Sequence, residues 1–422
     1  MDINRAMQQM RAGSQPLSKG LLFRREERGP LSWYFIATLL IVLAYGLVMV
    51  FSASYPTGYY RYNGDSYHFI RQQFIFAVIG VGAMFLISCT NYRWLKRWVW
   101  PVYAASIVLL IGALFTPTDT EGFHRWVNLF GIQFQPSELA KFSMMLFTAA
   151  LADRYKTKRK GLLYGFVMPL LLLAPFLLLM VLEPHFSGMI LMMMIFFTML
   201  ICGGCALRWL GLIIGGTAAG VAVLLTSQSN YVKTRLDGWQ LFTTDTSTMT
   251  YQTRQSMYSI ASGGLFGLGI GNSRQKHLWL PEATNDFVFS VVCEELGFLG
   301  AMLCMGLFAA LIIQGVLIAL RSPDLFGSML GIGIISQVAW QVFCNIAVVT
   351  NTIPNTGISL PFFSSGGTSL LMLLAEMGIL LSISRAGNAK MLETRRQRQE
   401  AFARKLNPEP RRVYHRGGTD PA

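Results

Sequence analysis

Two carboxylates stand where a long polar segment of the sequence gives way to a long apolar one. Glu282 and Asp286 are four residues apart, and the apolar run begins at Phe287. A carboxylate at such a boundary can serve as a general base at a membrane surface, its pKa raised by partial desolvation. The structural alternative for Asp286 stays open, because an acid at a helix start caps the helix and complements its dipole. Glu282 by itself is typical of an exposed loop acid.

A second charged pair lies at the start of another apolar run. Glu138 and Lys141 follow Pro136 and are three residues apart, so they share a helix face and can enter the membrane edge as an ion pair. Alternatively, Lys141 and nearby Arg125 offer cations for a diphosphate group. This second interpretation gains weight only if the substrate is a lipid diphosphate.

Three further acids, Glu294, Glu295 and Glu376, lie inside apolar runs. Carboxylates at membrane depth are costly and normally face a polar interior or a partner. They can form a proton or ion relay, or they can make structural hydrogen bonds to neighbouring helices. We favour the structural role.

Other motifs carry less weight. The run Gly267-x-Gly269-x-Gly271 resembles a dinucleotide fingerprint, but no strand precedes it, so we expect tight backbone turns there instead. His185 and His277 are isolated and have no ligand spacing, so no metal site is predicted. The six cysteines lie in or beside apolar runs without a paired extracellular pattern, and we expect no disulfides. Cys202 and Cys205 have the spacing of a redox or zinc motif, but the pair stands alone at the end of an apolar run, which favours close helix packing.

The elements that must position these residues are membrane spans. Hydrophobic residues make up 53% of the 422 residues and charged residues only 13%, whereas soluble domains carry about 25% charged residues. Apolar runs of about 18 residues or more recur, which is the length that crosses roughly 30 Å of hydrocarbon. The runs are continuous rather than alternating, so helices and not barrel strands are indicated. The predicted fold class is an all-α polytopic membrane protein.

The net charge of +14 is distributed as membrane topology requires. Lys and Arg concentrate in the two tails and in alternate short loops, which places these segments on the cytoplasmic side. The positive excess is therefore topological, and we expect no nucleic-acid partner. Both termini are predicted to be cytoplasmic.

About ten transmembrane helices are predicted. They cover residues 33–52, 74–89, 99–115, 136–153, 164–182, 186–202, 209–225, 287–320, 325–349 and 369–383. A cytoplasmic basic tail, 1–30, precedes the membrane domain, 31–385, and a basic tail that we expect to be disordered, 386–422, follows it. A large extracellular loop, 226–285, lies between the seventh and eighth spans. The turn-rich residues 354–368 are expected to form a re-entrant element.

A series of motifs recurs in order through residues 31–385. They are Arg125-Trp126-Val127-Asn128-Leu129, Phe134-Gln135-Pro136-Ser137-Glu138-Leu139-Ala140-Lys141, Tyr251-Gln252-x-x-Gln255-Ser256, Gly264-Leu265-Phe266-Gly267, Leu280-Pro281-Glu282-Ala283-x-x-Asp286-Phe287, Glu294-Glu295-Leu296-Gly297, Thr356-Gly357-Ile358 and Gly366-Gly367-Thr368-Ser369. Together they resemble the signature of the SEDS family, the proteins of shape, elongation, division and sporulation such as RodA, FtsW and SpoVE.

The resemblance implies peptidoglycan glycosyltransfer on the outer face of the bacterial cytoplasmic membrane. The substrate would be lipid II, a disaccharide-pentapeptide carried on undecaprenyl diphosphate. Asp286 matches the family's essential aspartate, so the resemblance implies that it is catalytic. As general base it would deprotonate the 4-hydroxyl of the acceptor sugar, which attacks the anomeric carbon of the donor. Undecaprenyl diphosphate would leave with inversion.

The resemblance also leads us to assign substrate-binding residues. They are Arg125, Trp126, Glu138, Lys141, Gln252, Lys276 and Glu282. Arg125, Lys141 and Lys276 are the cations that would compensate the diphosphate charge. A divalent cation is a candidate to share that task, although the sequence shows no dedicated ligand set, and no other cofactor is expected.

The implied partner is a class B penicillin-binding protein, a transpeptidase whose single span packs on the bundle, together with other membrane proteins of the division or elongation machinery. The long basic N-terminal tail, Leu280-Pro281-Glu282-Ala283 and Ser384-Arg385 resemble the FtsW and SpoVE branch more than RodA. This favours septal or sporulation wall synthesis. The alternatives are a RodA-like elongation polymerase, a lipid II flippase or transporter, and a scaffold that only recruits a transpeptidase.

Some positions depart from the family pattern. His185 stands where an Asp is usual, Ser365 where a Tyr is usual, and Asn351 where a Gly is usual. Glu376 is also unusual. No role is therefore carried over to the turn between the fifth and sixth spans.

Overall fold

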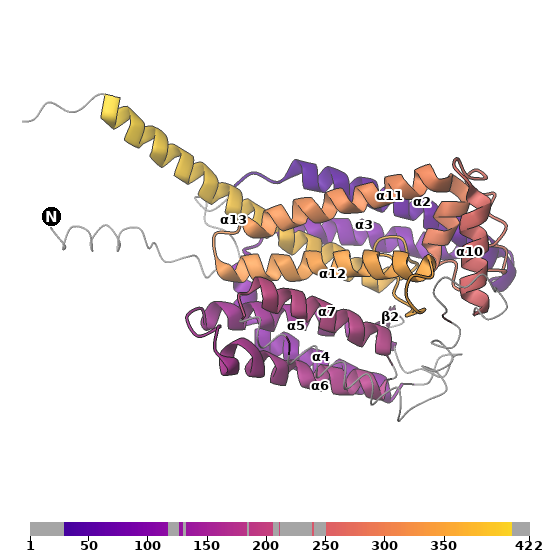
Figure 1. Ribbon diagram of the computed structural model, residues 1–422, viewed down its shortest axis with the longest axis horizontal. Helices are drawn as coiled ribbons and strands as arrows, with labels where there is room; N and C mark the ends of the chain where they lie inside the picture. The colour runs from indigo at the N-terminus through magenta and orange to yellow at the C-terminus, as the bar shows by residue number, and fades with distance from the viewer. Residues whose placement is uncertain are drawn as a thin grey trace, which may run out of the picture.

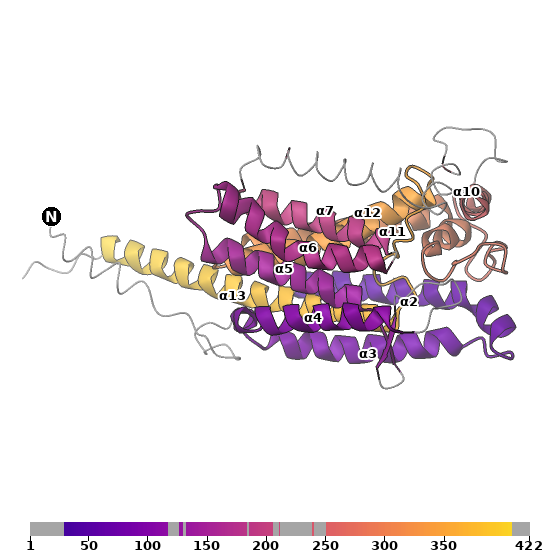
Figure 2. The same cartoon turned by 90° about the horizontal axis from the view of Figure 1, so that it is seen from below.

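The computed structural model describes residues 29–116, 126–129, 132–183, 185–205, 211, 239 and 250–406. Within these residues the chain forms an elongated helical bundle with irregular segments gathered at one end (Figures 1 and 2). We call this the loop end. The opposite end, from which the last helix projects, is called the tail end.

The helices come in two groups along the chain. The first group is α2 (Trp33–Arg61), α3 (His68–Ser88), the 3-10 helix η2 (Tyr92–Arg97), α4 (Val99–Leu114) and α5 (Pro136–Arg154). The second is the π-helix η3 (Leu163–Val167), α6 (Met168–Leu182), α7 (Phe186–Cys202), α10 (Tyr251–Gly263), α11 (Val288–Leu320), α12 (Leu325–Val349) and α13 (Gly367–Leu406). An antiparallel hairpin joins β1 (Val127–Leu129) to β2 (Ile132–Phe134).

Each predicted span outside residues 206–249 coincides with one of these helices. Six described helices are long and apolar enough to cross a membrane, and α4 and α7 are shorter apolar helices. The chain is therefore a multi-pass helical membrane protein. The predicted seventh span at 209–225, and most of the loop that follows it, lie outside the described residues. The total of about ten spans stays a prediction.

Two helices continue well past their predicted C-terminal ends. Helix α2 continues through a Tyr-rich stretch to Arg61 instead of ending near Ser52, because a helix needs apolar side chains only where it meets lipid. Helix α13 reaches Leu406, so the tail expected to be disordered from residue 386 is helical that far. Its exposed part is rich in Ala, Arg, Gln and Glu, which favour helix in water. The rest of the tail, 407–422, lies outside the described residues.

Helix α12 lies at the centre of the bundle and contacts α5, α7, α11 and α13. Small residues let the helices approach closely: a Cβ added at Gly331 would lie 2.9 Å from the Ala319 Cβ. Likewise, a Cβ added at Gly378 would lie 2.7 Å from the Met84 carbonyl oxygen. Close packing of this kind holds helices together in lipid, where the hydrophobic effect does not drive their association.

Helix α11 is kinked where the glycine-rich segment docks onto it. Gly297 has φ 67° and ψ −165° inside this helix, and the Gly269 amide donates to the Glu295 carbonyl at 2.9 Å. Gly267 has φ 80°, and a Cβ there would lie 2.2 Å from the Glu295 carbonyl oxygen, so only glycine fits. The predicted tight glycine turns are confirmed, and their role is to seat the loop end on α11.

Candidate active site

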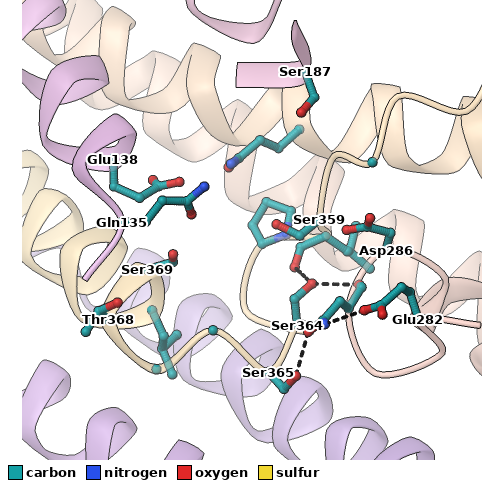
Figure 3. A pocket seen from close by; sticks show the side chains of 18 of the residues that line it. Gln135, Glu138, Ser187, Glu282, Asp286, Ser359, Ser364, Ser365, Thr368 and Ser369 are labelled. Atoms are coloured by element: carbon teal, nitrogen blue, oxygen red, sulfur yellow. Dashed lines mark hydrogen bonds between the residues drawn. The ribbon is translucent and has the colours of Figure 1, made fainter. Parts of the chain in front are cut away.

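The loop end of the bundle contains a cavity of about 1040 Å³. Its walls include the N-terminal ends of α5, α7 and α10, part of α12, the hairpin between α2 and α3, the hairpin of β1 and β2, and the segments 282–287 and 354–373. In Figure 3, Glu138 and Gln135 lie on one side of this cavity and Asp286 and Glu282 on the other. The volume is at the upper end of the range for ligand pockets, which suits a large polar head group.

Asp286 lies on the cavity wall directly before α11, and it is half-buried. Helix α11 begins at Val288, and Phe287 occupies the N-cap position with no side-chain capping bond. Asp286 therefore lies one residue before the N-cap position. The adjacent Phe287 ring is 1% exposed and anchors the chain in the core. The carboxylate consequently stands at a fixed point of the wall.

An amide from α12 holds the Asp286 backbone. The Asn345 Nδ2 donates to the Asp286 carbonyl at 2.7 Å and to the Ile358 carbonyl at 2.8 Å. One side chain thus joins the residues before α11 to the turn-rich segment 354–368. The Ser364 hydroxyl adds a second link, donating to the Asn285 carbonyl at 2.9 Å. The backbone at Asn285 and Asp286 is thus held by α12 and by the turn-rich segment, through partners 59 and 79 residues further along the chain.

Glu282 is exposed and lines the same cavity. Its φ is 54°, a left-handed conformation that costs a residue with a Cβ roughly 1–2 kcal/mol. The Asn285 Nδ2 donates to its carboxylate at 2.8 Å, and the Ser365 hydroxyl donates to Asn285 Oδ1 at 2.5 Å (Figure 3). These bonds offset the strain and hold a second carboxylate beside Asp286.

The predicted pair of Glu138 and Lys141 is confirmed. The Lys141 ammonium lies 2.8 Å from Glu138 Oε1, and its side chain is only 3% exposed. Glu138 lines the cavity from the first turn of α5, whereas Lys141 lies behind it. Lys141 therefore affects the cavity by neutralising the charge of Glu138, and its ammonium is not part of the cavity wall.

Lys276 is not at the cavity, which corrects the substrate contact predicted for it. Its side chain is 1% exposed, its ammonium lies 2.7 Å from Glu295 Oε1, and it donates to Ser52 Oγ at 3.1 Å. A buried ammonium needs a counter-ion, and Glu295 provides it. Lys276 thus belongs to the interior of the loop end.

The structural role favoured for the acids of α11 is confirmed. Glu294 accepts hydrogen bonds from the Ser259 and Ser273 hydroxyls at 2.9 and 2.5 Å and from the Arg274 amide at 2.9 Å. Together with the Glu295 pair, these bonds fix the segment before Asp286 to the membrane helix. Glu376 in α13 likewise accepts from Gln337 at 3.2 Å.

Three of the predicted substrate contacts remain: Trp126, Gln252 and Arg125. Trp126 and Gln252 line the cavity, and the Gln252 side-chain Oε1 accepts from the Asn355 Nδ2 at 2.8 Å. Arg125 directly precedes Trp126 but lies outside the described residues. Of the seven substrate contacts predicted, the structure therefore brings Trp126, Glu138, Gln252 and Glu282 to the cavity.

The described cavity wall is acidic. It carries the carboxylates of Glu138, Glu282 and Asp286 and no Lys or Arg. Among the described residues there is also no group of three or more His, Cys, Asp or Glu placed to hold a metal ion. Such a wall suits proton abstraction from a hydroxyl group. A polyanionic group in the cavity must find its counter-charge outside the described wall.

The model of the FtsW/RodA/SpoVE family, described as "Cell cycle protein", matches residues 32–389. The chain belongs to this family. Stage V sporulation protein E of Bacillus subtilis (strain 168) is 36% identical over 353 residues, covering 82% of this chain and 94% of that protein. Probable peptidoglycan glycosyltransferase FtsW of Geobacter sp. (strain M18) is 32% identical over 354 residues, with the same coverage of 82% and 94%.

Solved structures of similar proteins share the fold. A chain from a structure described as "Structural coordination of polymerization and crosslinking by a peptidoglycan synthase complex" aligns with a TM-score of 0.67 and 26% identity, over 84% of this chain and 98% of that one. Rod shape determining protein RodA of Thermus thermophilus aligns with a TM-score of 0.62 and 27% identity, over 84% and 97%. The predicted SEDS family membership is confirmed, together with a RodA-like helical fold.

One departure of this FtsW/RodA/SpoVE chain has a conformational explanation. Asn351, where the family resemblance led us to expect Gly, has φ 56°, and Asn tolerates this region better than other residues with a Cβ. We expect Asn351→Val to lower stability by about 1–2 kcal/mol and Asn351→Gly to change it little. Thermal unfolding of the purified protein in detergent measures both, and equal losses for Val and Gly would contradict the explanation.

Three polar residues of α12 belong to the site, although the sequence did not lead us to assign them to it. Gln337 and Gln341 line the cavity, and Asn345 holds Asp286. The three amides are spaced by four residues within an apolar run, so they share one helix face. Polar side chains within a span normally face the protein interior. Their spacing was therefore a usable signal.

Proposed function

We propose that this protein is a peptidoglycan glycosyltransferase that polymerises lipid II on the outer face of the bacterial cytoplasmic membrane. The observation that carries the proposal is the Asp286 carboxylate, which lines a 1040 Å³ cavity and whose backbone is fixed by Asn345. Support for the reaction class comes from the relatives named probable peptidoglycan glycosyltransferase FtsW, at 32–34% identity over most of the chain.

In the proposed mechanism Asp286 is the general base. It takes the proton of the acceptor's 4-hydroxyl as that oxygen attacks the anomeric carbon of the donor, and undecaprenyl diphosphate leaves with inversion. Trp126, Glu138, Gln252 and Glu282 contact the substrate from the surrounding wall. Glu282, beside Asp286, helps to orient the acceptor through its second carboxylate.

The leaving diphosphate needs positive charge that the described wall does not carry. Arg125 is our candidate, because it directly precedes Trp126, which lines the cavity. Lys141 contributes indirectly by neutralising Glu138 at 2.8 Å, which lowers the repulsion that a diphosphate meets. A divalent cation is a further candidate, but the described carboxylates do not form a ligand group for one, so no step is assigned to it.

The orientation in the membrane follows from charge. The basic loop between α5 and η3, with Lys156, Lys158, Arg159 and Lys160, lies at the tail end (Figure 1). Loops rich in Lys and Arg stay in the cytoplasm. This supports cytoplasmic termini and an extracellular loop end, and with them a cavity on the face where we propose that lipid II is polymerised.

The relatives also support a branch and a partner. The SpoVE relative is 36% identical, whereas the solved RodA is 27% identical, which favours division or sporulation over elongation. The solved complex is described as coordinating polymerization and crosslinking, which supports a crosslinking partner for this chain; we propose that it is a class B penicillin-binding protein. Other membrane proteins of the division machinery complete the proposed set.

A reconstitution experiment tests the function. The full-length protein in proteoliposomes, alone and with its partner transpeptidase, is given lipid II, and glycan strands are resolved by gel electrophoresis. We expect strands in at least one arm. Translocation of lipid II without polymer in both arms would instead identify a transporter, and the absence of both activities would leave the scaffold interpretation.

A further inference from the structure

The hairpin between α2 and α3 supplies an aromatic part of the cavity wall. Tyr62, His68 and Phe69 line the cavity, and Gln72 lines it one turn further along α3. The Tyr62 and His68 rings stack with centroids 3.8 Å apart and an interplanar angle of 14°. Phe69 meets Tyr62 edge-on at 5.4 Å. We call Tyr62, His68 and Phe69 the aromatic wall, and none of them has a part in the mechanism above.

A closed turn places these rings. Asn63 and Gly64 have φ of 50° and 88°, which reverses the chain within a few residues. The Asp65 amide donates to the Tyr62 carbonyl at 2.9 Å, and the Tyr67 amide donates to Asp65 Oδ1 at 3.1 Å. Because the turn is fixed by its own hydrogen bonds, the stacked rings are held in place before any ligand arrives.

Membrane anchoring does not explain the aromatic wall. Tyr residues often sit at the membrane surface, and α2, with 29 residues, is about 44 Å long, longer than the roughly 30 Å hydrocarbon layer. Tyr59 and Tyr60, which are 54% and 61% exposed near its end, fit the anchoring role and do not line the cavity. Tyr62 differs because its ring stacks on His68 and lines the cavity.

We propose that the aromatic wall is a saccharide subsite that holds the growing glycan strand beside the reaction centre. Sugar rings present apolar faces that pack on aromatic rings, and the exposed Gln72 amide can donate to and accept from hydroxyl and acetamido groups. Tyr62 is 42% exposed, so it can bind a strand while the cavity is in use. The wall has no Lys or Arg and does not suit the diphosphate. The proposal rests on the proposed function, because the strand is the product of that reaction.

The test compares two tyrosines on the same hairpin. Full-length wild type, Tyr62→Ala, Tyr62→Phe and Tyr60→Ala are reconstituted in proteoliposomes, and both the initial coupling rate and the strand-length distribution are measured with lipid II. We expect Tyr62→Ala to shorten the mean strand about five-fold, the effect of losing roughly one aromatic contact, and to lower the coupling rate by less. Tyr62→Phe keeps the ring and long strands, and Tyr60→Ala matches wild type.

Each other outcome overturns the proposal. Wild-type strand lengths from Tyr62→Ala show that the ring does not hold the strand. A lower coupling rate with unchanged length places the ring on the monomeric substrate, and equal shortening by Tyr60→Ala assigns the effect to lipid anchoring. If wild type makes no polymer, binding of a soluble β-1,4-linked N-acetylglucosamine oligomer is compared between wild type and Tyr62→Ala. Equal or absent binding there also contradicts the subsite.

Discussion

Asp286→Asn is expected to slow lipid II polymerisation by about 10²–10⁴-fold, the usual contribution of a general base. The carboxamide has nearly the same shape as the carboxylate but cannot accept the hydroxyl proton. The Asn345 amide donates to the Asp286 backbone carbonyl at 2.7 Å, a bond that the substitution keeps. The loss should therefore appear in the rate with little change in thermal stability. Initial rates and melting temperatures are measured on the same reconstituted preparations.

Glu282→Gln is the matched control. It removes a carboxylate from the same cavity wall, four residues away, and retains an oxygen that can accept from Asn285, as Glu282 does at 2.8 Å. We expect a much smaller loss, because Glu282 orients the acceptor and takes no proton. An Asp286→Asn protein that polymerises like wild type, or a larger loss from Glu282→Gln, would remove Asp286 from the role of base.

The helices were predictable because lipid leaves the backbone few options. Apolar runs of sufficient length must form helices, and the predicted runs agree with helices such as α6, α7 and α12 in their described positions. The extension of α2 to Arg61 was not predictable from apolarity, because its last turns need no lipid contact. Hydropathy therefore locates a span but not the end of its helix.

The site was predictable only in part, because sequence spacing reports contacts along one helix. Glu138 and Lys141 are three residues apart, and their pair was foreseen. The Asn345 link to Asp286 joins residues 59 positions apart, and no local pattern encodes it. Lys276 was assigned from the family resemblance and its charge, but its partner, Glu295, is 19 residues away, beyond Asp286 in the sequence. Contacts between residues far apart in the chain were therefore the part of the site that sequence spacing did not reveal.

The second large effect is expected at that buried pair. Lys276→Met leaves the Glu295 carboxylate, which is 0% exposed, without its ammonium. Loss of one partner of a buried ion pair typically costs about 3–5 kcal/mol, because the remaining charge stays uncompensated. Thermal unfolding in detergent should show a large drop in melting temperature. Arg274→Met, two residues away at an exposed position, removes the same charge and should change it little.

The double variant Lys276→Met/Glu295→Met separates the contribution of the ion pair to stability from the contribution of side-chain packing. Removing both charges takes away the unpaired carboxylate, and apolar replacements of buried ion pairs are often neutral. We therefore expect the double variant to recover most of the stability that Lys276→Met loses, although Ser52, which donates to Glu295 at 2.6 Å, loses its acceptor. If Lys276 contacted the diphosphate instead, Lys276→Met would melt like wild type and lose activity, and the double variant would recover nothing. That result would indicate that Lys276 contacts the substrate, and it would contradict the burial of Lys276 in the interior of the loop end.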